Sequence, residues 1–147
     1  MSLSSSNADL PGVHLNSVVN APHQFSYESG VLVTRVEPGF AQGVLEVGPN
    51  SINPHGMVHG GALCTLADNA AGMAAHTDGR LYVTQSSTFQ FVKNQGSGTI
   101  YAAARVRHRG RSTALVSVEI TGDNHRLLAV AEFTMFCVGS GVTGEQA

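Results

Sequence analysis

The chain has 147 residues, a length that suits one domain. Only 12% of its residues are charged and its formal net charge is -2, which argues against nucleic acid as a partner, because Lys and Arg supply most of the affinity for phosphate. No stretch is long and apolar enough for a membrane helix, and the N-terminus lacks the basic start and apolar run of a signal peptide. Two cysteines cannot build a disulfide framework, so we expect a cytoplasmic protein, and the sparse charge predicts a homo-oligomer.

In chain order, the pattern predicts two strands, one helix and four strands. Residues 1–12 and 139–147 are small and polar, and we expect a disordered N-terminal segment and a flexible C-terminal tail around a single domain at residues 13–138. Val31–Glu37 and Gly43–Val47 are predicted strands joined by a turn at Pro38 and Gly39. The other four strands are rich in β-branched and aromatic residues, and we expect an antiparallel meander of residues 81–92, 99–109, 113–122 and 126–138.

The helix is predicted from about Gly60 to about Thr77. Its apolar residues recur with helical spacing along one stripe, and most of them are Ala, which lets the helix backbone lie close to another layer. An antiparallel sheet that curves around a single helix is the simplest way to bury this stripe. The stripe consists of Leu63, Leu66, Ala67, Ala70, Ala71 and Ala74.

The start of this helix lacks the usual cap. About four backbone N–H groups are unpaired at a helix start, and a Ser, Thr, Asp or Asn side chain normally satisfies part of them. Here His59 is at the cap position and Gly60 and Gly61 follow, so we expect an open positive end that another group can approach closely. Such an end can stabilise negative charge on a carbonyl oxygen. The alternative is a tight turn in which glycine only relieves crowding.

Asp68 lies in the middle of the apolar helix, where Asp has a low helix propensity. It is either an ordinary solvated side chain or a catalytic carboxylate. Gly60 and Asp68 are separated by ~12 Å along the helix axis at 1.5 Å per residue. They cannot both touch one reacting carbon from a single chain, so a site that uses both must be shared between two subunits.

The run from Asn53 to Asp68, NPHGMVHGGALCTLAD, resembles the motif of hotdog-fold acyl-CoA thioesterases of the phenylacetate-pathway type. The resemblance covers roughly residues 28–138. It implies an α+β hotdog fold, in which a curved antiparallel sheet wraps around one long central helix. It also implies hydrolysis of an acyl-CoA to the free acid and CoA, with no metal and no bound cofactor, by a homodimer or a homotetramer.

The same resemblance implies a role for each matching residue. Gly60 would offer its backbone N–H to the thioester oxygen. Asn53 and His59 would shape that pocket and hydrogen-bond the carbonyl or the water. Asp68 of the facing subunit would act as general base or attack the thioester carbon itself.

The predicted strand at residues 81–92 carries two further features. The resemblance matches Thr84 to a Ser or Thr that helps to hold the attacking water, and Ser86, expected on the same strand face, is the alternative. Phe89 and Phe91 also share a face, and we expect them in the core or in a subunit interface.

Basic residues alternate in the run RVRHRGR, which contains Arg105, Arg107, Arg109 and Arg111. A regular strand would place all of them on one face, where guanidinium groups could bind the phosphates of coenzyme A. An exposed sheet face kept soluble by charge is the alternative. The resemblance places a nucleotide contact near the following turn. The expected CoA-binding residues are therefore Gly61, Arg105, Arg107, Gly110, Arg111 and Ser112.

Other assignments use the same residues. His55, His59 and Asp68 could form a zinc site, and Cys64 could act as a nucleophile with His59. The chain could also be an enoyl-thioester hydratase or dehydratase, or a module that binds acyl-CoA without turnover. Aryl, medium-chain and hydroxylated acyl groups are all compatible with the sequence, and so are a dimer and a tetramer.

Overall fold

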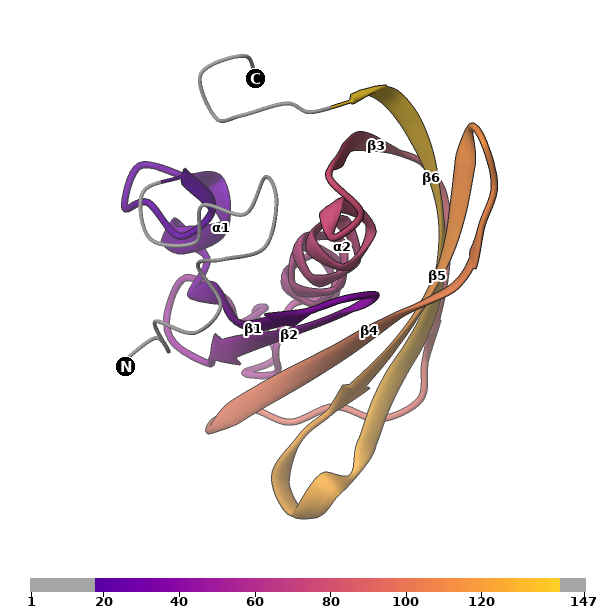
Figure 1. The fold of residues 1–147 in the computed structure, drawn as a ribbon. Coiled ribbons are helices and arrows are strands. Elements are labelled where there is room, and N and C mark those ends of the chain that lie inside the picture. Colours follow the sequence, from indigo (N-terminus) through magenta and orange to yellow (C-terminus); the bar gives the residue numbers. More distant parts are fainter. Residues whose placement is uncertain (1–17, 141–147) are drawn as a thin grey trace.

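The computed structural model describes residues 18–140 (Figure 1). It confirms the predicted order of two strands, one long helix and four strands, and adds a short helix before them. The expected disordered segment at residues 1–12 and the tail beyond Ser140 lie outside the described residues. The elements are α1 (Phe25–Glu28), β1 (Val31–Glu37), β2 (Phe40–Glu46), α2 (Gly60–His76), β3 (Arg80–Phe91), β4 (Thr99–Arg109), β5 (Thr113–Thr121), the 3-10 turn η3 (Asp123–His125) and β6 (Leu127–Ser140).

The six strands form one antiparallel sheet, in the order β1-β2-β4-β5-β6-β3, that curves around α2 (Figure 1). This is the predicted hotdog architecture. β1 and β2 form the predicted hairpin at Pro38 and Gly39, and β4, β5 and β6 pair consecutively as expected. β6 also includes Gly139 and Ser140, which the sequence placed in the tail.

The predicted four-strand meander is wrong at its first strand. β3 pairs with β6 at the edge of the sheet instead of with β4. Residues 92–98 connect β3 to β4 without forming a hairpin, and hydrogen bonds hold this connection against the turn between β5 and β6. The buried Gln95 donates to the Ser97 carbonyl (2.8 Å) and accepts from the Asp123 N–H (3.0 Å), so it ties this connection to the turn between β5 and β6. The chain therefore crosses the end of the sheet before β4 begins.

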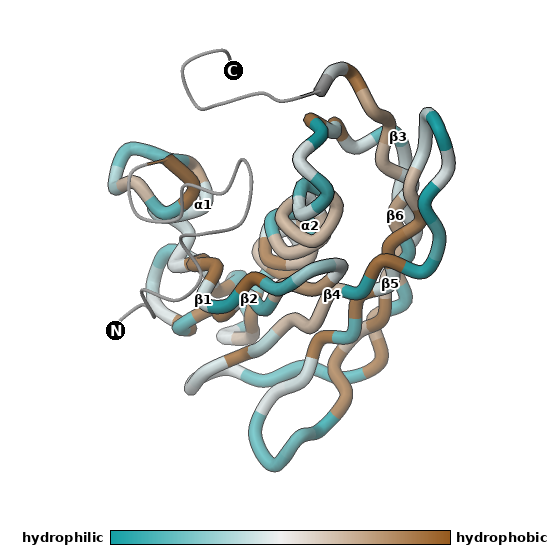
Figure 2. The backbone as a smooth tube through the Cα atoms, viewed as in Figure 1, coloured by the Kyte–Doolittle hydropathy of each residue, from teal (hydrophilic) through white to brown (hydrophobic). Residues whose placement is uncertain are grey.

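The concave face of the sheet and the stripe of α2 form the core. All six residues of the predicted stripe are buried. Apolar residues recur along the strands that surround α2, whereas the connections between strands are mostly hydrophilic (Figure 2). Within residues 18–140, no helix is both long and apolar enough to cross a membrane.

Small residues bring α2 close to β2. A Cβ atom added at Gly43 would lie 2.9 Å from the Leu66 Cδ1 atom, and Leu66 is fully buried. No side chain fits between the strand and the helix at this point without displacing one of them.

We therefore expect Gly43→Val to lower the free energy of unfolding by about 1–3 kcal/mol, because an added side chain must displace packed core atoms. Chemical denaturation followed by circular dichroism measures this, since the chain has no Trp. Gly48→Ala is the control, because no atom lies within 4 Å of its added Cβ. Equal stability of the two variants would show that the helix has room to move.

Candidate active site

The side chain of His59 caps the N-terminus of α2. Its Nδ1 atom accepts a hydrogen bond from the Gly61 N–H at 2.8 Å. The expectation of an uncapped helix end is therefore wrong for Gly61, because an imidazole nitrogen can accept as an Asn oxygen does. The Gly60 N–H has no acceptor among the described residues. The helix end thus keeps one available donor, and it comes from Gly60.

The loop before the helix is closed by Asn53. The Oδ1 atom of Asn53 accepts hydrogen bonds from the backbone N–H groups of His55 (2.9 Å) and Met57 (3.2 Å). The backbone N–H of Asn53 donates to the Met57 carbonyl at 2.7 Å. Val58 then donates its N–H to the Gln95 carbonyl at 2.9 Å. These bonds determine the path by which the chain enters α2.

Asp68 lies on the exposed side of α2 and faces β3. Its Oδ1 atom accepts a hydrogen bond from the Thr84 hydroxyl at 2.6 Å, and that hydroxyl also lies 3.6 Å from the Met135 sulfur. Asp68 and Thr84 are both exposed in this chain. The carboxylate is therefore oriented by a neighbour, while its second oxygen remains available.

A β-bulge decides which side chains of β3 face the helix. Thr84 lies opposite Met135 and Ser87 lies opposite Phe133, and both partners are buried on the side of α2. Opposite residues of an antiparallel pair point to the same face. Because the register shifts between Thr84 and Ser86, it is Ser87 that shares the face of Thr84, and the expectation for Ser86 is wrong. An alternation pattern contains no signal for this shift.

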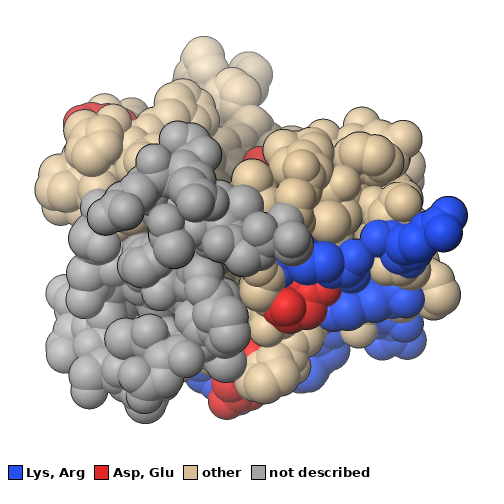
Figure 3. Space-filling model, turned by 45° about the horizontal axis from the view of Figure 1, so that its top comes forward, with Lys and Arg blue, Asp and Glu red and all other residues tan. Residues whose placement is uncertain are grey.

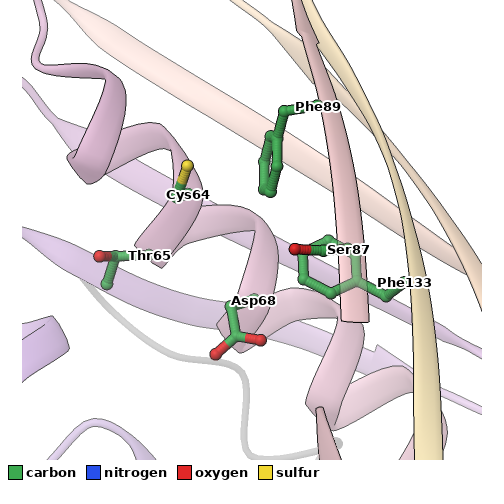
Figure 4. A pocket seen from close by; sticks show the side chains of 6 residues that line it. All are labelled: Cys64, Thr65, Asp68, Ser87, Phe89 and Phe133. Atoms are coloured by element: carbon green, nitrogen blue, oxygen red, sulfur yellow. The ribbon is translucent and has the colours of Figure 1, made fainter. Parts of the chain in front are cut away.

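A pocket of about 260 Å³ lies between α2, β3 and β6 (Figure 4). Aromatic rings form one wall: Phe89 meets Phe133 edge-on at 5.6 Å and stacks with Phe91 at 5.7 Å. Phe89 packs against the core, as the sequence predicted, and it also lines this cavity, whereas Phe91 is exposed. The pocket is lined by Cys64, Thr65, Asp68, Ser87, Phe89 and Phe133.

Two alternative chemistries lack support at this pocket. Burial of the Cys64 thiol, followed by the negative charge of Asp68, raises the pKa of Cys64, so this thiol is a poor nucleophile at neutral pH. Within residues 18–140, no three His, Cys, Asp or Glu side chains are grouped as metal ligands would be. His55 belongs to the loop closed by Asn53, and the Nδ1 atom of His59 is already used.

The four alternating arginines do not share one face. The register of β4 and β5 shifts between Val106 and His108, which turns Arg109 to the inner side of the sheet. There its guanidinium donates to the Ala75 carbonyl at 2.9 Å and to the Ala74 carbonyl at 3.2 Å. Arg109 therefore caps the C-terminus of α2, where its positive charge also interacts favourably with the helix dipole.

The other arginines of the run are exposed. Arg105 lies over the ring of Phe40, with 4.7 Å between the guanidinium carbon and the ring centroid. The guanidinium groups of Arg107 and Arg111 donate no hydrogen bond to any residue that the structure describes. Arg111 lies in the turn between β4 and β5, hereafter the 110–112 turn, in which the Gly110 N–H donates to the Thr113 carbonyl at 2.7 Å.

The sequence profile of the thioesterase superfamily matches residues 55–129, which include the helix start, Asp68 and Thr84. The chain belongs to this superfamily. The acyl-coenzyme A thioesterase PaaI of Escherichia coli is 31% identical over 117 residues, which cover 79% of this chain and 84% of PaaI. With this fold and family, the protein is a thioester hydrolase.

Two further relatives of the thioesterase have informative names. The 1,4-dihydroxy-2-naphthoyl-CoA hydrolase of Listeria monocytogenes is 29% identical over 110 residues, which cover 72% of this chain and 89% of that one. A hypothetical thioesterase protein of Streptococcus pneumoniae has a crystal structure with coenzyme A. It is 28% identical, with a TM-score of 0.75 over 81% of this chain and 94% of that one.

Beyond the C-terminal end of α2, away from the pocket, the thioesterase has a charged cluster that the sequence did not indicate. The Asp78 carboxylate accepts from the Tyr82 hydroxyl (2.7 Å) and from Arg80 Nε (2.8 Å), and it pairs with Arg109 (3.1 Å). Burial raises the pKa of Asp78, but the hydrogen bonds and the Arg109 charge outweigh burial, so this pKa lies below its usual value. Burial and the bond to Asp78 raise the pKa of Tyr82, which keeps its hydroxyl a donor.

We expect Asp78→Asn to lower the free energy of unfolding at pH 7 by about 1–2 kcal/mol. A carboxylate with a depressed folded-state pKa stabilises the fold above its unfolded pKa of about 4, and this stabilisation is lost as the pH falls through the folded-state value. Urea denaturation at pH 7 and pH 3, at equal protein concentration, should therefore show a smaller difference between parent and variant at pH 3. An unchanged difference would mean that the substitution disturbs packing instead of charge.

Proposed function

We propose that this thioesterase hydrolyses an aryl or medium-chain acyl-CoA to the free acid and CoA. The observation that carries the proposal is the exposed Asp68 carboxylate, held by Thr84 at a pocket walled by Phe89 and Phe133. Aromatic walls suit an aryl or alkyl group, and a carboxylate beside them suits attack by water. The acyl-CoA names of PaaI and the Listeria hydrolase support the substrate class.

In the proposed mechanism, Asp68 removes a proton from the attacking water or attacks the thioester carbon itself. The Thr84 hydroxyl donates to one carboxylate oxygen and so aims the other at the reacting carbon. Either role requires the ionised carboxylate. The thiolate of CoA leaves as the tetrahedral intermediate collapses, and in the general-base route it takes the proton that Asp68 removed from water. If Asp68 attacks instead, the collapse leaves a mixed anhydride with Asp68, which water then hydrolyses to the free acid and the carboxylate. The reaction needs water, a carboxylate and a hydrogen-bond donor, and no metal or bound cofactor.

The Gly60 N–H would stabilise the oxyanion of that intermediate. It is a donor at the positive end of α2, and no described residue accepts from it. His59 accepts at Nδ1, so its neutral ring carries the proton on Nε2 and can donate to the carbonyl or to water. The side-chain oxygen of Asn53 is used within residues 53–57, which leaves the Nδ2 amide group to donate to the carbonyl or to the water.

The site would be shared between two copies of the chain. Gly60 and Asp68 lie ~12 Å apart along α2, so the Asp68 that acts with one Gly60 must come from the partner subunit. β3 is an edge of the sheet and carries Asp68's partner Thr84, and its residues 83–88 are exposed. A homodimer that covers this edge would bring the two halves of the site together, and a homotetramer would pair two such dimers.

Coenzyme A would extend from this site toward the basic face. On the face that Figure 3 shows, Lys and Arg side chains gather on one side, with acidic side chains among them, although the net charge is negative. Arg107 and Arg111 offer exposed guanidinium groups, which bind phosphate well. Arg105, Gly110 and Ser112 complete the proposed nucleotide site. Gly61 is left out, because its N–H is bound to His59.

We expect Asp68→Asn to lower kcat/KM about 10²–10⁴-fold, the usual contribution of general acid–base catalysis. Release of free thiol from phenylacetyl-CoA, benzoyl-CoA and octanoyl-CoA measures this. Glu119→Gln, an exposed site on β5, is a control with the same charge change. Equal rates in parent and Asp68→Asn would contradict the proposed role. Formation of hydroxyacyl product from an enoyl-CoA, or tight binding without turnover, would contradict the proposed reaction.

Gly60→Pro should lower kcat about 10²–10³-fold, because it deletes the proposed oxyanion donor. Proline is well tolerated at the first position of a helix, and His59 before it has the extended conformation that proline requires. Gly60→Ala keeps the N–H, and its Cβ would lie 3.8 Å from the Phe91 ring, so it should lose much less activity. An equal loss of kcat in Gly60→Pro and Gly60→Ala would mean that the size of the side chain at this position limits activity and that the N–H group does not contribute.

The same two variants test whether the site is shared. Asp68→Asn and Gly60→Pro are each expected to be nearly inactive. If subunits exchange in a mixture of both, heterodimers contain one site with an intact Gly60 and an intact Asp68, and activity returns. A mixture that exchanges subunits but stays inactive would contradict a site shared between Gly60 of one chain and Asp68 of the other.

A further inference from the structure

The 110–112 turn has all three of its carbonyl groups bound toward the body of the protein. Arg80, the first residue of β3, donates from one terminal nitrogen to the Arg111 carbonyl (2.8 Å) and from the other to the Gly110 carbonyl (3.2 Å). The Cys137 N–H donates to the Ser112 carbonyl at 2.8 Å. Three consecutive peptide groups are therefore oriented by contacts from other strands.

This orientation determines where the N–H groups of the turn point. In a trans peptide, the N–H of one residue points opposite to the carbonyl of the residue before it, and the described chain has no cis peptide bond. Because the carbonyls of Gly110 and Arg111 point at Arg80, the N–H groups of Arg111 and Ser112 point away from it. Neither N–H has an acceptor among residues 18–140. The Arg111 and Ser112 side chains beside them are exposed.

Three of the five guanidinium N–H groups of Arg80 are already used within the protein. Its Nε atom donates to Asp78, its two terminal nitrogens donate to the turn, and its guanidinium lies over the Tyr82 ring at 5.2 Å. Its side chain is 27% exposed. In contrast, the Arg111 guanidinium donates to no described residue. The contacts of Arg80 therefore point to an effect on a ligand that is exerted through the turn.

We propose that Arg80 is a positioning residue, which turns the Arg111 and Ser112 N–H groups outward to bind a phosphate group of coenzyme A. Successive backbone N–H groups with a hydroxyl and a guanidinium beside them form an anion site of a common kind. Asp78 fixes Arg80 in turn, through Nε and through the Arg80 N–H, which donates to Asp78 Oδ1 at 3.0 Å. The inference rests on the proposed function and adds the residue that prepares the nucleotide site.

The test compares two substrates that share the same thioester. Acyl-CoA carries the phosphates, and acyl-pantetheine does not. In Arg80→Gln we expect KM for acyl-CoA to rise about tenfold while kcat changes less than twofold, since phosphate binding is remote from the reacting carbon. The kcat/KM for acyl-pantetheine should stay unchanged. A merely structural role would lower the rates with both substrates together, and this outcome overturns the inference.

Two controls sharpen the result. Arg126→Gln removes the same charge and also one bond to a backbone carbonyl, that of Asn94 (3.0 Å), at the opposite end of β5, and it should leave KM for acyl-CoA unchanged. In an Arg111→Gln background, Arg80→Gln should raise KM much less than it does alone, because both residues act through one turn. If the effects of Arg80→Gln and Arg111→Gln on KM for acyl-CoA are fully additive in free energy, the inference is overturned.

The parent enzyme separates failure of this inference from failure of the proposed function. If the parent hydrolyses acyl-pantetheine with the same kcat/KM as acyl-CoA, the phosphates contribute no binding, and the inference is overturned while the thioesterase proposal stands. If it hydrolyses neither substrate, both are overturned.

Discussion

The burial of α2 in the curve of the sheet is the constraint on which the rest of this structure depends. The stripe of α2 is mostly Ala, and Gly43 of β2 leaves no space beyond what the helix occupies. Small residues on both sides let the two layers come close, so the sheet can wrap around one helix. The helix then cannot rotate without burying Asp68 or exposing Leu66. Its position therefore decides where the catalytic candidates lie: Gly60 at its start and Asp68 on its exposed side.

Two β-bulges refine that arrangement. In β3, the shift after Thr84 brings Ser87 to the pocket and keeps Thr84 beside Asp68. In β4, the register shift after Val106 turns Arg109 away from the exposed face of the other arginines. Its guanidinium therefore reaches the carbonyl groups at the C-terminal end of α2. An extra residue in one strand inverts the alternation beyond it. As a result, Ser86 and Ser87 lie on different faces of β3, and Arg107 and Arg109 lie on different faces of β4.

Charge pairing joins three chain segments at the far end of the helix. Asp78 follows α2, Arg80 begins β3, and the 110–112 turn joins β4 to β5, and hydrogen bonds connect all three. Arg109 adds the helix C-terminus to the same cluster. A partly buried carboxylate needs several donors, and these donors come from elements that also position the proposed nucleotide site. The cluster therefore links the stability of this end to the shape of the 110–112 turn.

The sequence by itself determined the features that depend on local chemistry and periodicity. The helical stripe predicted α2 and its buried face, the glycines after His59 marked an unusual helix start, and the run from Asn53 to Asp68 indicated the family. These signals lie within one element or one loop, so neighbouring residues suffice to express them. Tertiary structure alone decided the pairing of β3 with β6, the two bulges, the capping by Arg109 and the contacts of Arg80. Each of these depends on a partner distant in sequence, such as Met135 for Thr84 or Arg111 for Arg80, and residue spacing carries no information about which distant backbone will lie opposite.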